Sequence, residues 1–293
     1  MNTTQLYQEV TDRILAEMEK GFIPWQRPWT SSTGAVSHTS GRPYSLLNQM
    51  LITIGSDNPE VHYGEYLTFN QAKAEGGMVR KGEKGKWIVF WKMYPKEREK
   101  EDGSKMIDVI PCLKNYYVFE VSQCDNIERR HKPDERQVPD PVAEAEQVVG
   151  TYFDRETCGL RICESNRAYY SPVEDMVNVP QMSQYDAAAA YYSTLFHEMT
   201  HSTGHPTRLD RIQPGNVHFG SEVYSKEELV AEMGAAFLLN RVGIDCQKAF
   251  RNSVAYLQSW SAKFREDARL FVTAAGRAEA AVNYILNGKE AAK

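Results

Sequence analysis

Three histidines and a glutamate lie within nine positions of the segment LFHEMTHSTGH, residues 195–205. His197 and His201 are four residues apart, so on a helix both imidazoles project from one face about one turn from each other. Such a pair can bind one zinc ion, and Glu198, next to the first histidine, can accept a proton from a metal-bound water. The H-E-x-x-H pattern therefore indicates a metal-dependent hydrolase.

A third protein ligand decides the type of site, because catalytic zinc usually takes three protein ligands and one water. Metzincins would have a histidine where this chain has Thr207. His205 comes two residues earlier, directly after Gly204, and we expect it to be a surface or supporting group. The segment SKEELVAEMGAAFLL offers Glu228 and Glu232 instead, four residues apart on one helix face.

One of these two glutamates can bind the metal while the other accepts the N–H of a ligating histidine. The pair resembles that of the glutamate zincins, in which the ligand precedes its supporting acid, and on this resemblance Glu228 is the ligand and Glu232 the support. Alternatively, Ser225 begins the helix and Glu228 bonds back to it in a capping box, which would make Glu232 the ligand. We favour Glu228. Tyr224 and His218 are candidates for stabilising an oxyanion, but a structural role is favoured for both.

The residue types and the spacing of apolar residues predict the helices and strands that position these groups. Helix formers fill QYDAAAAYYSTLFHEMTHSTG up to Gly204, and YSKEELVAEMGAAFLLNRVG is an amphipathic helix that ends at Gly243. A helix is expected over 143–158 and short strands over 160–180, with DMVNVP as a sheet edge that aligns an extended peptide. With Glu198 as general base and then proton donor, the expected reaction is peptide or amide hydrolysis.

The N-terminal part of the chain has its own elements. Short helices are expected at 45–55 and 68–77, and a strand in KWIVFWKMY with NYYVFEVSQC as its partner. The charged KEREKEDGSK between the two strands reads as a hairpin tip or loop. Apolar residues four apart predict a helix over the first ~20 residues: Leu6, Val10, Ile14 and Met18.

Residues 73–100 carry nine Lys or Arg against four Glu, in a chain whose formal net charge is −5. Cations interleaved with rings are typical of surfaces that bind single-stranded nucleic acid, although an ordinary solvated turn would also contain such lysines. Trp87 and Trp91 share an apolar strand face and are expected in the core. The candidate DNA-binding residues are Arg80, Lys81, Lys84, Lys86, Lys92, Phe90 and Tyr94, with Trp25 and Trp29 of the loop PWQRPW.

The amino-acid composition and the position of a charged, proline-rich segment indicate how the chain is organised. Five cysteines without CxxC spacing fit reduced thiols, and the chain shows neither a signal peptide nor an apolar run long enough to span a membrane, so we expect a soluble, cytoplasmic protein. The charged, proline-rich segment IERRHKPDERQVPDPVAEAE is typical of a linker. We predict an α+β protein with domains at 1–127 and 143–293, joined by a linker at 128–142.

Further segments follow one another in a fixed order: PWQRPW, SGRPYSLLNQMLI, YLTFNQAKAEGGMVRKGEKGKWIVFWKMY, YVFEVSQC, HEMTHSTGHPTRLDR, EELVAEMGAAFLL and YLQSWSAKFREDARLFVTAAGRAEAAVNYIL. In these segments the chain resembles the ArdC antirestriction proteins of conjugative plasmids. The resemblance implies an N-terminal single-stranded-DNA-binding domain, also found in TraC-type plasmid primases, and a C-terminal zincin-like metallopeptidase domain. It also implies protection of incoming plasmid DNA from host restriction endonucleases.

Two alternatives stay open at this point. The chain can be a zinc peptidase whose N-terminal domain binds a protein partner, or a DNA-binding protein whose metal site is not catalytic. The peptide or protein substrate is not identified by any motif. The expected cofactor is Zn²⁺, but a His/His/Glu set also accepts manganese, cobalt or nickel.

Overall fold

The computed structural model describes residues 2–26, 34–54, 64–99, 105–131, 140–163, 167–212, 222–245 and 254–289. Trp29 and His218 lie outside these residues, and so does the side chain of Tyr224. The helices and strands are, in chain order, α1 Thr3–Glu19, η1 Pro24–Gln26, β1 Ala35–Ser37, α2 Leu46–Thr53, β2 Gly64–Thr68, α3 Phe69–Ala74, β3 Met78–Val79, β4 Lys86–Glu99, β5 Lys105–Glu120, η2 Val121–Gln123, β6 Cys124–Asp125, α4 Pro141–Arg155, β7 Gly159–Cys163, β8 Tyr169–Ser171, β9 Met176–Pro180, η3 Met182–Gln184, α5 Ala188–Ser202, α6 Glu222–Val242, α8 Val254–Glu266 and α9 Leu270–Asn287.

Helix α1 confirms the predicted N-terminal helix. Asn2 caps its start through reciprocal bonds with Gln5, and Gly21 follows its end with a φ of 86°, a conformation that favours glycine. The four apolar residues spaced four apart are all buried, so this face of the helix joins the core. The helices predicted at 45–55 and 68–77 are confirmed as α2 and α3.

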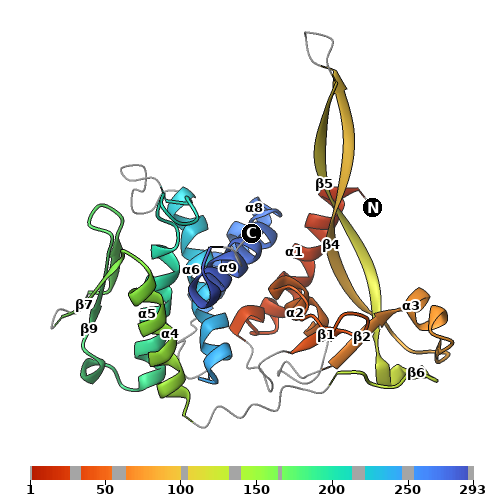
Figure 1. The fold of residues 1–293 in the computed structure, drawn as a ribbon, viewed down its shortest axis with the longest axis horizontal. Coiled ribbons are helices and arrows are strands. Elements are labelled where there is room, and N and C mark those ends of the chain that lie inside the picture. Colours follow the sequence, from red (N-terminus) through yellow and green to blue (C-terminus); the bar gives the residue numbers. More distant parts are fainter. Residues whose placement is uncertain are drawn as a thin grey trace.

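The N-terminal sheet has the strand order β1-β2-β5-β4, with β1 and β2 parallel and the other pairs antiparallel. Strands β4 and β5 pair from Lys86 opposite Val118 to Glu99 opposite Lys105 and form a long arm that projects from the body (Figure 1). The hairpin predicted between these two strands is confirmed, but residues 96–99 and Lys105, which were assigned to its tip or loop, belong to the paired strands. Pairing continues because an antiparallel hairpin satisfies its own backbone groups without a covering layer.

The two faces of the hairpin differ as the alternation predicted, but not for every residue. Trp87 and Val89 are buried on the face toward α1, and the Arg13 guanidinium lies 4.6 Å from the Trp87 ring. Trp91 shares this face but is 47% exposed, so its expected place in the core is wrong. Trp91 lies farther along the arm than Trp87. There the Tyr7 ring of α1 contacts it at a ring-centroid distance of 6.1 Å, and about half of the Trp91 side chain stays exposed.

The outer edge of β4 is partly covered by a side chain of α2. Asn48 Nδ2 donates to the Val89 carbonyl at 2.7 Å, and the Val89 amide donates to Asn48 Oδ1 at 2.9 Å. Asn48 is 1% exposed. Its amide thus supplies the donor and acceptor that a further strand would offer at this point.

The C-terminal region places a three-stranded sheet, of order β7-β9-β8, against helix α5, and α6 and α9 lie on the other side of that helix (Figure 1). Strand β9 pairs with β7 in parallel and with β8 in antiparallel. The prediction that DMVNVP forms a sheet edge is wrong, because β9 is the central strand. Among the described strands of this sheet, the edges are β7 and β8.

The N-terminal and C-terminal regions share one hydrophobic core. Trp25 of η1 is 1% exposed and packs against Phe264 and Phe271, at ring-centroid distances of 6.2 and 5.7 Å. Thr11 of α1 donates to the Ala268 carbonyl at 2.8 Å. The division into two domains remains a prediction. The hydrophobic core contains residues from both sides of the predicted boundary.

The described part of the predicted linker is anchored to the N-terminal sheet. The amides of Arg130 and His131 donate to the buried Glu65 carboxylate at 3.0 and 2.6 Å. The other end of the predicted linker overlaps α4, which begins at Pro141. None of the helices that the structure describes is long and apolar enough to cross a membrane.

Candidate metal centre

Helices α5 and α6 lie against each other and carry the candidate ligands. His197 and His201 occupy one face of α5, as their spacing predicts. Gly234 of α6 lies so close to α5 that an added Cβ would come within 2.6 Å of the Thr200 side chain. The glycine therefore lets the two helices approach closely, which brings the first half of α6 over the two histidines.

Helix α6 begins at Glu222, three residues before Ser225. Ser225 is therefore inside the helix and does not cap it, so the capping-box alternative for Glu228 is wrong. The helix begins earlier because EVYSKEEL contains good helix formers and no breaker before Ser225. Glu228 is thus available to face α5.

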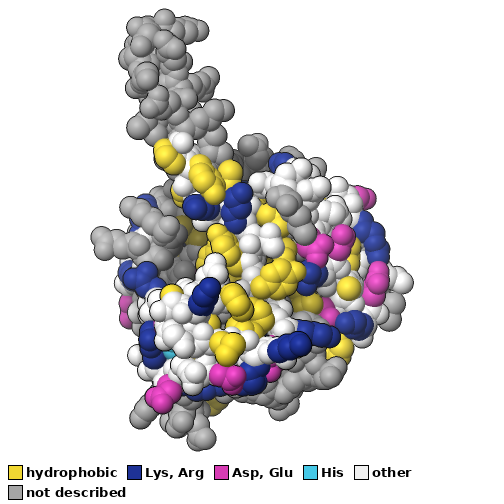
Figure 2. Space-filling view, turned by 90° about the vertical axis from the view of Figure 1, so that its right-hand side faces the viewer, with side chains coloured by type: hydrophobic (Ala, Val, Ile, Leu, Met, Phe, Trp, Pro, Cys, Tyr) yellow, Lys and Arg dark blue, Asp and Glu magenta, His cyan; other side chains and the backbone are white. Residues whose placement is uncertain are grey.

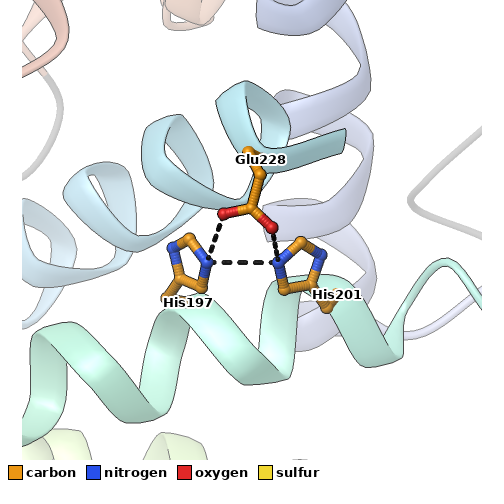
Figure 3. Close-up of side chains that lie close together, drawn as sticks. All are labelled: His197, His201 and Glu228. Atoms are coloured by element: carbon orange, nitrogen blue, oxygen red, sulfur yellow. Dashed lines mark hydrogen bonds and ion pairs between the residues drawn. The ribbon is translucent and has the colours of Figure 1, made fainter. Parts of the chain in front are cut away.

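His197, His201 and Glu228 converge on one point between the helices (Figure 3). The two Nε2 atoms are 3.1 Å apart, and each lies 3.4 Å from a different Glu228 oxygen. Two ligand atoms at about 2.0–2.1 Å from a tetrahedral ion are about 3.3 Å from each other. The spacing of the three ligand atoms therefore fits a divalent cation of zinc's size.

A cavity of about 360 Å³ opens over this cluster. Glu198, 8% exposed, borders it on α5, next to His197. Its other walls include Tyr169 and Tyr170 of the edge strand β8, together with Ile212. Glu198, the three candidate ligands and an edge strand of the described sheet therefore border the same space.

The structure identifies a residue that sequence reasoning missed, Glu227. Its Oε1 is 3.6 Å from His201 Nδ1, on the side of the imidazole away from Glu228. Its carboxylate also pairs with Arg211, at 2.8 Å from Nη2 and 3.2 Å from Nε. The available signal was the E-E pair next to the candidate ligand, but spacing alone does not say which histidine nitrogen faces it.

Charge governs the pKa values in this cluster. Burial alone would lower the pKa of His201, but Glu227 and Glu228 outweigh it and raise the pKa to about 10. Burial alone would raise the pKa of both carboxyls; the histidines hold the pKa of Glu228 well below its usual range, and His201 with Arg211 lowers that of Glu227. Both glutamates are therefore anionic, which suits a cation site.

Glu232 lies one turn beyond Glu228 and is not part of the cluster of three. Its carboxylate accepts a hydrogen bond from the Tyr256 hydroxyl of α8. Burial raises the pKa of Glu232. Glu227 faces His201 from behind, whereas Glu232 interacts electrostatically with His197, so its expected supporting role stays a prediction.

His205 also stands apart from the cluster. Its Nδ1 is 2.8 Å from the Thr207 hydroxyl, in the turn that follows α5. This agrees with the expected surface or supporting role. Farther along this turn, the Ile212 amide donates to the Gly204 carbonyl at 2.8 Å, so the chain folds back beside the candidate metal ligands.

Two buried arginines hold this returning segment in place. Arg208 donates to the Ser202 carbonyl at 2.7 Å and pairs with Asp175 in the β8–β9 turn. Arg211 donates to the Thr200 carbonyl at 2.9 Å and pairs with Glu227. The two side chains therefore tie the end of α5 to the sheet on one side and to α6 on the other.

The predicted DNA-binding residues separate into groups. Trp25 is buried among the C-terminal helices, so its assignment to a DNA surface is wrong, because a ring that fills the core cannot stack on a base. Arg80 donates to Glu83 at 2.9 Å and to the Ser122 carbonyl at 2.6 Å, which compensates much of its charge. Lys81 and Lys84 are exposed and Lys86 is half-buried.

Lys92, Phe90 and Tyr94 lie together on one face of β4, and the register adds Lys114 and Tyr116 of β5 to the same face. We call these five residues the aromatic-cationic face. Phe90, Tyr94 and Tyr116 are 37–43% exposed, and Lys92 Nζ and Lys114 Nζ lie 5.3 and 5.8 Å from the Tyr94 ring. Figure 2, drawn from the side on which β4, β5 and α3 lie, shows hydrophobic and cationic side chains interspersed below the arm.

A groove of about 510 Å³ runs along the base of this face. Arg42, Tyr44, Phe90, Lys92 and Tyr116 are among its lining residues. The rings of Tyr44, Phe90 and Tyr116 follow one another at centroid distances of 6.1 and 6.0 Å. Sequence reasoning missed Arg42, Tyr44, Lys114 and Tyr116, although the pairing of NYYVFEVSQC with KWIVFWKMY could have indicated the last two.

Two family models match the chain. The model for the N-terminal domain of anti-restriction factor ArdC matches residues 4–119, and a model for zincin-like metallopeptidases matches residues 148–277. The second range contains the three candidate metal ligands and Glu198. A zincin-like domain implies a divalent metal.

Solved structures of similar fold include two crystal structures of the antirestriction ArdC protein from plasmid R388. The metal-free structure is 33% identical, covers 97% of this chain and 98% of its own, and superposes with a TM-score of 0.71. The Mn(II)-bound structure is 32% identical over the same shares, with a TM-score of 0.70.

Curated relatives include a DNA primase TraC of Escherichia coli, 31% identical over 96% of this chain. The chain spans only 27% of that primase and 20% of a second TraC primase. An uncharacterized protein, y4eC, of Sinorhizobium fredii is 29% identical over 94% of this chain and 90% of its own length.

Proposed function

Because the chain belongs to the ArdC family of antirestriction proteins and carries a zincin-like metallopeptidase domain, we propose that it hydrolyses peptide bonds with a divalent metal as cofactor. The observation that carries the proposal is the convergence of His197, His201 and Glu228 beside a buried glutamate. Two imidazoles and a carboxylate suit Zn²⁺, and an ArdC relative has been crystallised with Mn(II). Zinc is the metal we favour.

The chain's own residues supply the remaining chemistry. A divalent cation held by His197, His201 and Glu228 would polarise the scissile carbonyl and lower the pKa of a bound water toward ~7. Glu198 is placed to accept the proton of the attacking water and to deliver it to the leaving amine. Among the described strands, β8 is an edge of its sheet and borders the cavity, so its backbone groups can pair with an extended peptide, the role first expected of DMVNVP.

Metal analysis of Glu228→Ala and Glu232→Ala, side by side, tests the ligand assignment. We expect Glu228→Ala to lose bound metal, because one of three protein ligands is removed, and Glu232→Ala to keep it. Both purified variants are loaded with Zn²⁺ or Mn²⁺, dialysed and measured by elemental analysis. Retention of metal by Glu228→Ala with loss by Glu232→Ala would reverse the assignment.

We further propose that the aromatic-cationic face binds single-stranded DNA. Exposed rings in a row can stack on successive bases while Lys92, Lys114 and Arg42 contact phosphates. Of the residues proposed from sequence, Phe90, Tyr94 and Lys92 belong to this face, and the exposed Lys81 and Lys84 extend the basic surface of the same region. The TraC primases and the ArdC N-terminal model support a DNA ligand for this half.

Binding of a fluorescent oligothymidine at increasing salt tests the DNA proposal. We expect the affinity to fall steeply with salt and to depend little on base sequence, since phosphate contacts and stacking tolerate all bases. Binding that is absent at low salt would instead favour an N-terminal region that contacts a protein partner.

Protection of incoming plasmid DNA is the function we propose for the whole chain. Conjugation into restricting and non-restricting recipients measures it, with and without the chain expressed. We expect the chain to raise plasmid establishment only in the restricting recipient. Glu198→Gln in the same assay separates a requirement for hydrolysis from a requirement for DNA binding alone, and equal establishment with and without the chain would refute protection.

A further inference from the structure

We propose that Glu227, held by Arg211, is a positioning residue that orients His201 for metal binding and sets the metal affinity of the site. The inference rests on the proposed metal site. It assigns a role to an ion pair that lies outside the three candidate ligands. The contacts on both sides of the His201 imidazole support this proposal.

His201 offers its two nitrogens to two different carboxylates. Nε2 lies 3.4 Å from Glu228 and 3.1 Å from His197 Nε2, so this nitrogen faces the candidate cation. Nδ1 lies 3.6 Å from Glu227 Oε1. A carboxylate behind a ligating histidine accepts the N–H of the other nitrogen, which fixes the tautomer and makes the ligating nitrogen more basic.

Arg211 restrains the Glu227 carboxylate on the other side. Both Glu227 oxygens contact the guanidinium, at 2.8 and 3.2 Å, and both side chains are less than 10% exposed. Arg211 is itself bound to the Thr200 carbonyl and the Thr203 hydroxyl, at 2.9 and 3.0 Å. The bidentate pair thus fixes the carboxylate relative to the last turn of α5, which also carries His201.

The 3.6 Å separation is longer than an N–H···O bond by about 0.4 Å. The contact is therefore an ion pair in the structure, and we expect it to shorten to a hydrogen bond when the site holds its metal. The pair therefore restrains His201, because a ring that turns away from the cluster loses its contact with the Glu227 carboxylate.

Arg208 provides a matched control, because it is a second buried arginine in the same returning segment. It pairs with Asp175 and the Ser202 carbonyl, and its described contacts do not include Glu227. Loss of packing or of loop order should therefore affect both arginine variants alike. Only Arg211→Lys should affect the metal.

The experiment measures Zn²⁺ and Co²⁺ affinity by competition with a chromophoric chelator. We expect Glu227→Gln and Arg211→Lys to weaken affinity by roughly 10- to 100-fold, and Arg208→Lys to bind as the wild-type protein does. The visible spectrum of the Co²⁺ form should change in Glu227→Gln and stay unchanged in Arg208→Lys, because it reports ligand geometry rather than stability.

Glu227→Gln leaves Arg211 buried without its counterion and can unfold the chain, so the double variant Glu227→Gln with Arg211→Gln is measured as well. It carries neither charge, and we expect it to fold and still show the loss of affinity. Folded variants with wild-type affinity and an unchanged Co²⁺ spectrum would overturn the positioning role. Failure of the wild-type chain to bind any metal would instead refute the proposed function itself.

Discussion

The His201 side chain lies between two carboxylates, one of a candidate metal ligand and one of a supporting residue. Its Nε2 faces Glu228, and its Nδ1 faces Glu227. The ligand pattern on α5 could be predicted, because i and i+4 spacing is a property of any helix. The supporting residue could not, since neighbouring residues on α6 reach His201 only through the particular way in which α5 and α6 cross. Helix crossing depends on packing at Gly234, not on local spacing.

Glu198→Gln should abolish hydrolysis while the metal stays bound. The amide cannot accept the proton of the attacking water, and general-base catalysis contributes roughly 10²- to 10⁴-fold. Cleavage of labelled casein and elemental analysis of the same samples measure the two effects. The exposed Glu266→Gln is the control. Cleavage by Glu198→Gln at the wild-type rate would exclude Glu198 as the base.

At the scale of elements, alternation along KWIVFWKMY correctly predicted a two-faced strand, but not its length. The arm extends beyond the core, so Trp91 is half exposed although Trp87, on the same face, is buried. Periodicity gives the direction in which a side chain points and not how far the covering helix reaches. The same limit explains why DMVNVP was predicted as an edge: strand order depends on long-range pairing.

Tyr116 and Tyr117 are adjacent exposed tyrosines on opposite faces of β5, which makes them a matched pair. We expect Tyr116→Ala to weaken oligothymidine binding by roughly 1–3 kcal/mol, about 5- to 150-fold, because it removes a stacking ring. Tyr117→Ala should leave binding unchanged. Fluorescence anisotropy at fixed salt measures both, and equal losses would contradict a single binding face.

The Asp175–Arg208 pair joins the β8–β9 turn to the end of α5 and should make stability depend on pH. Burial raises the pKa of Asp175, but bonds from Arg208 and Tyr170 outweigh it and hold the pKa below its usual range. A carboxyl whose pKa is lowered by folding stabilises the protein above its unfolded pKa of about 3.9 and loses this contribution as pH falls through the folded value.

Asp175→Asn should therefore lower the free energy of unfolding at pH 7 by about 1–3 kcal/mol, because it weakens the partner of a buried guanidinium. The difference from wild type should shrink below about pH 4. Urea unfolding at several pH values measures it, with the exposed neighbour Glu174→Gln as control. A difference that does not change with pH would contradict the ionic origin.

At the scale of the whole molecule, the two matched family regions are joined by packing as well as by the chain between them. Trp25, which lies near the start of the sequence, fills a site among Phe264 and Phe271 near its end. Its motif PWQRPW suggested a loop, because its two prolines favour irregular structure and composition does not reveal a long-range partner. The existence of two functional regions was predictable; their common core was not.

Trp25→Ala should destabilise both regions together. A buried tryptophan replaced by alanine costs about 3–5 kcal/mol. Thermal unfolding followed by near-ultraviolet circular dichroism should show one transition in the wild-type protein and a lower one in the variant. Trp91→Ala, on the arm, should change the midpoint much less. Two separate wild-type transitions would show that the shared core does not couple the regions.

Asn48 has a consequence for how copies of this chain meet in concentrated solution. A long exposed strand invites pairing with the strand of another molecule, which leads to polymerisation. At Val89 both backbone groups are already occupied by the Asn48 amide. An incoming strand would have to displace a buried side chain to extend the ladder into the body, so self-assembly through β4 is blocked where the strand meets the core.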